Sequence, residues 1–234
     1  MKRLLMAVLV LAWPAFQALQ AQSNLSKADQ KTLIFMAEEE KMARDFYQAM
    51  EAKWEAKVFN HIVGAEQRHL GRTEELAASL DVKLPKGMVD GEAGKYRNND
   101  IQQLYDELAA LGSQSLEGAL RAGARLEEIN IRDLKMALET TTDGTARGTY
   151  RSLLEASGNH LRAFNKNLAA QGITYSPVLL PQADFDAIVD SGGNGQGCQG
   201  QKAQSGKGCC QGKGAKQGGC CQGGRKGKGK QPAN

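Results

Sequence analysis

The first 190 residues of this 234-residue chain contain no cysteine, so no disulfide bond can staple a core built from them. No stretch shows the strict alternation of apolar and polar residues that marks a β-strand. Beyond the first 21 residues, no run is long and apolar enough to cross a membrane. These absences favour a helical domain with a packed core and no membrane span.

Residues 191–234 contain no acidic and no aromatic residue. They hold seven lysines and one arginine, a charge of +8, and 15 of these 44 residues are glycine. Such a segment lacks the apolar surface to fold, so we predict a disordered tail. The whole chain carries +4, which leaves −4 for residues 1–190. With no aromatic ring to stack on bases, nucleic acid is not expected as a partner, whereas anionic surfaces stay open.

All five cysteines lie in this tail, and four of them form two copies of a Gly-Cys-Cys-Gln-Gly unit. They are Cys198, Cys209, Cys210, Cys220 and Cys221. Thiolates suit soft metals such as copper(I) or zinc, so one interpretation is a metal-binding tail. The other is a basic appendage with incidental thiols, because adjacent cysteines do not have the CxxC spacing of structural zinc sites.

The first 21 residues have the order of an export signal. Lys2 and Arg3 precede an apolar run at 4–13, and small residues at 18–21 offer a cleavage site. The alternative is an uncleaved anchor, but the run is short for a bilayer and Pro14 interrupts it. We therefore expect a soluble, exported protein in the periplasm.

Residues 22–190 are expected to form an all-α, antiparallel four-helix bundle. Apolar residues recur at helical spacing, Ser26 can cap the first helix, and Gly172 can stop the last. The expected long helices span 27–52, 55–81, 115–140 and 146–170, with a short extra helix, capped by Asp100, at 101–111. Residues 84–99 should form a loop, and residues 173–189 a capping segment across the bundle.

Polar residues interrupt the apolar stripe of every long helix. Glu66 and His69 are three residues apart and so share one face of the second helix. Charged groups in a core are costly unless something binds them. Taken singly, such a glutamate is usually solvated and such a histidine is usually a satisfied core residue. Because all four helices show the interruption, we predict one metal-ligand cluster: Glu40, Glu66, His69, Glu127 and His160.

The residue types indicate the metal. Carboxylates bridge hard cations, and imidazole suits iron, manganese or zinc, so we expect iron or manganese. The expected roles are Glu66 and Glu127 as bridges, Glu40 as a terminal ligand, and both histidines as nitrogen ligands. Glu128 competes with Glu127, since the helical phase is uncertain by one residue.

Other residues of these helices have separate expectations. Tyr47 and Tyr150 are candidates for neighbours of the metal. The remaining acids of the first two helices are expected on solvated faces: Glu38, Glu39, Asp45, Glu74 and Glu75.

Several motifs resemble known families. The run Glu-Lys-Met-Ala-Arg-Asp-Phe-Tyr at 40–47, Glu-x-x-His at 66–69 and His-Leu-Arg-Ala-Phe at 160–164 are similar to rubrerythrin ligand motifs. EEEKMARDFY, AEQRH, LEEINIRDL and SGNHLRAF, in this order, resemble more closely the ferritin-like family named domain of unknown function 2202. The resemblance covers about residues 27–172. It implies a ferritin-like fold with a di-iron-type site, but no known reaction.

The sequence also departs from the rubrerythrin pattern. Ser157 stands where the last helix should carry a glutamate, Asn130 follows Glu127 at the i+3 position, and the CxxC iron domain is absent. One or two ions therefore both stay open. The functions considered are an oxidoreductase acting with oxygen or peroxide, a non-enzymatic metal-sequestering envelope protein, and a structural bundle without metal. The sequence leaves homo-oligomer formation open.

Overall fold

The structure, a computed structural model, describes residues 25–191, which form six helices and contain no strand. The helices are α1 (Lys27–Trp54), α2 (Lys57–Ser79), α3 (Asn99–Gly112), α4 (Leu116–Thr140), α5 (Gly144–Ala170) and α6 (Gln182–Ser191). No helix in this part of the chain has the length and hydropathy of a membrane span. The predicted export signal at 1–21 and the tail beyond 191 lie outside the described residues.

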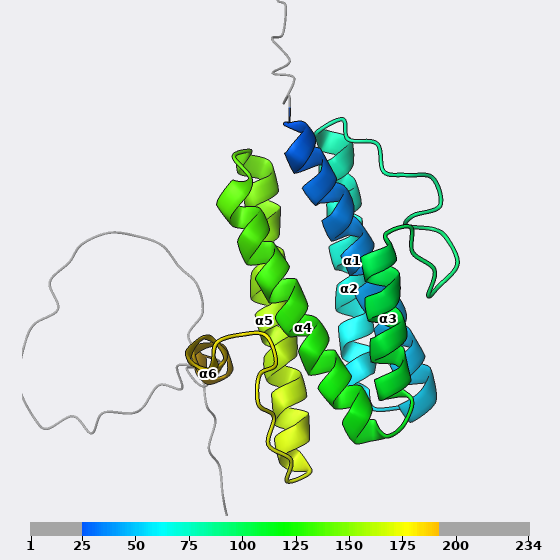
Figure 1. Ribbon diagram of the computed structural model, residues 1–234, viewed down its shortest axis with the longest axis vertical. Coiled ribbons are helices and arrows are strands. Elements are labelled where there is room, and N and C mark those ends of the chain that lie inside the picture. The colour runs from blue at the N-terminus through cyan, green and yellow to red at the C-terminus, as the bar shows by residue number, and fades with distance from the viewer. Residues whose placement is uncertain (1–24, 192–234) are drawn as a thin grey trace, which may run out of the picture. The chain divides into compact units, whose positions relative to one another are not determined.

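The long helices pack as two pairs. α1 lies along α2, α4 lies along α5, and the pairs meet where α2 contacts α5 and α1 contacts α4 (Figure 1). The short helix α3 packs on α1 and α4, and α6 packs on α5. The all-helical prediction is confirmed, and the polar cluster described below lies between the two pairs.

The helix ends follow mostly from local chemistry. The Ser26 hydroxyl accepts a hydrogen bond of 3.0 Å from the backbone N–H of Asp29, which caps α1 as predicted. Gly172, just after α5, has a φ of 73°, the left-handed conformation in which glycine ends helices. The predicted cap of α3 was wrong. The Asn98 side chain caps this helix by accepting hydrogen bonds from the N–H groups of Asp100 and Ile101.

The segment predicted only to cap the bundle contains a helix, α6, which begins directly after Pro181. Glu128 holds the strap that precedes it and is fully buried. Its carboxylate accepts hydrogen bonds from the Tyr175 hydroxyl at 2.5 Å and from the backbone N–H groups of Val178, Leu179 and Leu180 at 3.0, 2.7 and 2.8 Å. Glu128 therefore anchors the strap to α4.

The expectation that Glu38 and Asp45 face solvent was wrong, because the loop between α2 and α3 covers that side of α1. Asp45 is 2% exposed and accepts hydrogen bonds from Lys41, Gly94 and Tyr96 at 2.7, 3.1 and 3.1 Å. Glu38 is also buried and accepts from the N–H groups at 97 and 98. The acids expected on the exposed face of α2, Glu74 and Glu75, are exposed.

Candidate metal centre

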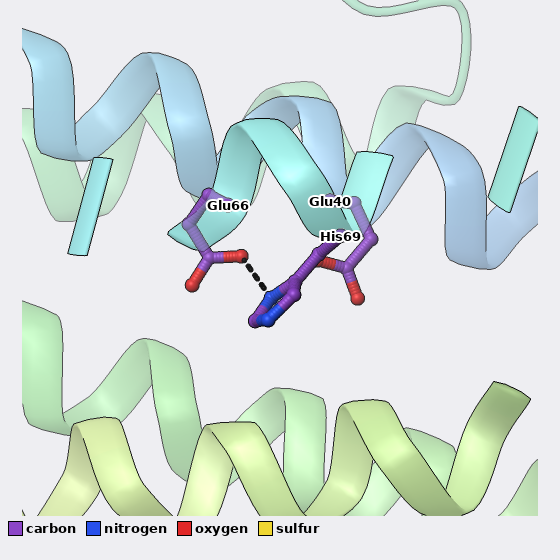
Figure 2. Close-up of side chains that lie close together, drawn as sticks. All are labelled: Glu40, Glu66 and His69. Carbon is purple, nitrogen blue, oxygen red and sulfur yellow. Dashed lines mark hydrogen bonds and ion pairs between the residues drawn. The ribbon is translucent and has the colours of Figure 1, made fainter. Parts of the chain in front are cut away.

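Three of the predicted residues form a first group between α1 and α2. His69 Nδ1 lies 3.0 Å from Glu66 Oε2 and 3.6 Å from Glu40 Oε2. Figure 2 shows the imidazole between the two carboxylates, with all three side chains directed from α1 and α2 toward the α4–α5 pair. All three residues are buried. A carboxylate from α1 thus meets the Glu-x-x-His pair of α2 in the core.

A second group joins α2 to α4 and α5. His160 Nδ1 lies 2.8 Å from Glu66 Oε1 and 3.2 Å from Glu127 Oε1. Neither contact has the alignment of a hydrogen bond, and three atoms of this group are buried without a partner: Glu66 Oε1, Glu127 Oε2 and His160 Nδ1. We therefore treat both contacts as charge attraction.

Glu66 is common to both groups, because each of its oxygens faces a different histidine. The rings of His69 and His160 stack, with centroids 5.5 Å apart. Glu127, which was expected to bridge with Glu66, groups only with Glu66 and His160. The arrangement is two carboxylate–imidazole half-sites that share one carboxylate.

The charges of the cluster are strongly coupled. Burial alone would raise the pKa of Glu66, but the contacts with His160 and His69 lower it to about 2. Burial would lower the pKa of each histidine, but the neighbouring carboxylates raise it to about 9 for His69 and about 10 for His160. Without a metal, protons on the histidines balance the buried carboxylates.

Burial dominates at the two outer carboxylates. It raises the pKa of Glu40 to about 8 despite the hydrogen bond and charge of His69, and it raises the pKa of Glu127 against the attraction of His160. Tyr47 donates a 2.6 Å hydrogen bond to Glu127 Oε1, as expected of a neighbour of the site. Tyr150 lies in a separate apolar cluster, ten residues before His160 on α5, or about 15 Å along a helix.

The donor set fits a hard or borderline divalent cation. Each group offers two carboxylate oxygens and one imidazole nitrogen, all within 4.8 Å of one another. Metal–ligand bonds of about 2.0–2.2 Å place the ligands of one ion up to about 4.4 Å apart, so side-chain shifts of a few tenths of an ångström suffice. A cation would also satisfy the three partnerless atoms of the second group.

The structure separates Glu127 from Glu128, which sequence left as competitors. Both are fully buried, but Glu127 faces His160 whereas Glu128 holds the strap. Ser157, one turn before His160, is buried as well, so no carboxylate stands at that position.

One buried acid pair was missed. Glu39, expected to face solvent, is 4% exposed, and burial together with the nearby Asp133 raises its pKa well above the ordinary range. Asp133 itself is 9% exposed. Three consecutive glutamates at 38–40 spread over about 200° of a helix, which was a signal that a helix packed on several sides would bury more than one.

Comparisons with known proteins match the whole helical region. The sequence model of the family described as "Uncharacterized protein domain (DUF2202)" matches residues 29–192. The chain belongs to this family. The DUF2202 match begins inside α1 and ends just after α6, so all five residues of the cluster lie within the family domain.

Similar proteins extend the comparison to a solved structure. The chain is 30% identical over 167 residues to the "Uncharacterized protein MJ0754" of Methanocaldococcus jannaschii, covering 71% of this chain and 89% of the relative. It is also similar to the "Crystal structure of hypothetical protein MJ0754 from Methanococcus jannaschii DSM 2661", with a TM-score of 0.67, 31% identity, and coverage of 70% of this chain and 93% of the other. The DUF2202 domain thus has a solved relative with the same overall fold.

Proposed function

We propose that this protein is an exported, ferritin-like metal-binding protein whose core holds iron or manganese and acts with oxygen or peroxide. The observation that carries the proposal is the position of Glu66: it is 1% exposed, and its two oxygens face two different histidines. A buried carboxylate shared in this way has the chemistry of a bridge between two cations.

Each half-site has a distinct set of ligands. Glu40 and His69 would complete one side of Glu66, and Glu127 and His160 the other. When bound, iron or manganese would supply one-electron redox chemistry with oxygen species. The protein's part is to exclude bulk water, to fix the two imidazoles, and to hold Glu127 through the Tyr47 hydroxyl.

A second candidate is a non-enzymatic protein that sequesters metal in the cell envelope. Ser157 favours it, because the half-site of His160 lacks the carboxylate expected one turn earlier in the helix. Fewer carboxylates leave more of the metal charge uncompensated and one ion more weakly held. For residues 191–234, soft-metal binding by the cysteines and attraction to anionic surfaces stay proposals, as does export directed by residues 1–21.

An oxygen-reaction assay separates these candidates. The metal-free full chain is titrated with Fe²⁺ without oxygen, bound iron is counted, and oxygen is then admitted. We expect bound Fe²⁺ and oxygen uptake faster than that of the same Fe²⁺ in buffer, with a ferric absorption spectrum. Iron binding with no faster uptake would favour sequestration. No bound iron, manganese or zinc would favour a structural bundle.

A further inference from the structure

The five residues of the metal cluster are at most 8% exposed, so an ion must reach them through packed side chains. A surface pocket of about 230 Å³ opens between α1, the start of α3 and α4. Glu39 and Asp133 line it from α1 and α4, although both are at least nine-tenths buried. Glu39 directly precedes Glu40 of the cluster, so the pocket wall and the site share one turn of α1.

The carboxylate of Glu39 is free to meet a cation. It receives no hydrogen bond and no ion pair from any residue in the described part of the chain, and its nearest charged neighbour is another acid, Asp133. Asp133 is held by Arg132, at 2.6 and 2.8 Å, but the Arg132 side chain is 47% exposed and can turn toward solvent. The charged lining residues are Glu39, Asp100, Asp133, Arg125 and Arg132.

A second observation connects the pocket with the site. Asn130 is 5% exposed, and its side-chain oxygen is buried without a partner. It lies three residues after Glu127 and three before Asp133, so Glu127, Asn130 and Asp133 follow one side of α4 at a spacing that brings successive side chains to about 5–6 Å. A buried carbonyl oxygen without a donor is costly, and a passing cation would satisfy it.

The other approach to the site is less suited to cations. His69 and His160 are slightly exposed where α2 meets α5, but Arg72 reaches across this seam and donates a 2.8 Å hydrogen bond to Ser152. Arg72 lies three residues after His69, so a cation entering there would pass a guanidinium group. The pocket, in contrast, presents carboxylates.

We propose that the Glu39–Asp133 pocket is the entrance through which divalent cations reach the core, with Asn130 as an intermediate oxygen ligand. This inference rests on the proposed function, since a core that binds no metal needs no entrance. It assigns to three residues outside the ligand cluster a role in the rate of metal uptake and none in final affinity.

The test is stopped-flow uptake of Co²⁺ by the metal-free full chain, followed by visible absorption. Glu39→Gln should slow uptake by about tenfold or more, because it removes the carboxylate that concentrates cations at the pocket. Asp133→Asn should act in the same direction. The final absorption and the equilibrium affinity should stay within about twofold of the wild type. The difference in rate should shrink at high salt.

Two controls carry the same size of charge change elsewhere. Glu155→Gln, exposed on α5, and Arg72→Gln, at the α2–α5 seam, should load at the wild-type rate. Wild-type rates for both pocket variants, or faster uptake by Arg72→Gln, would overturn the entrance while leaving the metal site standing. Loss of final occupancy in Glu39→Gln would also overturn it, by making Glu39 part of the site. A wild type that takes up no Co²⁺ would overturn the metal site itself.

Discussion

Replacing Glu66 by alanine is expected to remove metal from both half-sites at once. Glu66 supplies one oxygen to each group, and no other residue of the cluster belongs to both. Mutating groups that merely support a metal ligand costs about 10–100-fold in affinity, so losing a shared ligand should lower the affinity for Mn²⁺ by at least about 100-fold. Titration calorimetry and the metal content of the dialysed protein measure this directly.

The single-site variant Glu40→Ala grades this result. Glu40 belongs only to the group of His69, so its loss should spare the group of His160 and leave part of the binding. Glu74→Ala, which removes the same charge from an exposed position of α2, should change nothing. A folded Glu66→Ala protein that still binds Mn²⁺ as tightly as the wild type would refute the shared carboxylate.

The metal-free protein should become less stable as the pH rises from about 6.5 to 9. The folded-state pKa values of His69 and His160 are raised to about 9 and about 10 from an ordinary 6.5. Their contribution to stability is therefore complete below pH 6.5 and is lost as the pH rises through the folded values. The pKa of Glu40 is raised to about 8, so its deprotonation between pH 4.5 and 8 acts in the same direction. A melting-temperature fall of at least about 3 °C is expected.

At the acid end the sign reverses. The pKa of Glu66 is lowered to about 2, so its contribution is present above its ordinary pKa of 4.5 and is lost as the pH falls toward 2. Stability of the metal-free protein should therefore be highest in mildly acidic solution.

Metal should invert the alkaline trend. Imidazole and carboxylate bind a cation only after losing their protons, so binding strengthens as the pH rises and releases protons. The increase in melting temperature on adding Mn²⁺ should therefore grow from pH 6.5 to 9. His160→Gln should flatten both trends, whereas His61→Ala, at an exposed position of α2, should keep them. A metal-free protein whose melting temperature is flat over this range would contradict the coupled cluster.

The helices were predictable because they depend on local patterns. Apolar residues at helical spacing, the Ser26 cap and the Gly172 stop are properties of short stretches, and the structure agrees with them to within a few residues. The convergence of four helices was predictable because polar interruptions occurred on every stripe. Helix α6 was missed because it has ten residues and one buried side chain, too little for a periodic signal.

The surroundings of α1 were not predictable from its own pattern. A stripe describes one buried face, but α1 also contacts α3, α4 and the loop before α3. Glu38, Glu39 and Asp45 therefore lie in the interior, where backbone N–H groups, Lys41 or a second acid meet them. Which loop covers which face depends on the packing of segments distant in sequence.

The same limit applies inside the site. Glu127 and Glu128 are adjacent and equally buried, so periodicity could not choose between them, and only the strap at 178–180 shows what Glu128 binds. Tyr47 and Tyr150 both lie on apolar stripes, but only Tyr47 is at the depth of the cluster.

The most direct measurement is an anomalous difference map from crystals grown with Mn²⁺, with data collected on both sides of the manganese absorption edge. The account predicts a peak on each side of Glu66, one within about 2.2 Å of ligand atoms of Glu40 and His69, the other against Glu127 and His160, about 3.5–4 Å apart. Manganese bound only at the surface, with no peak between the four long helices, would contradict it.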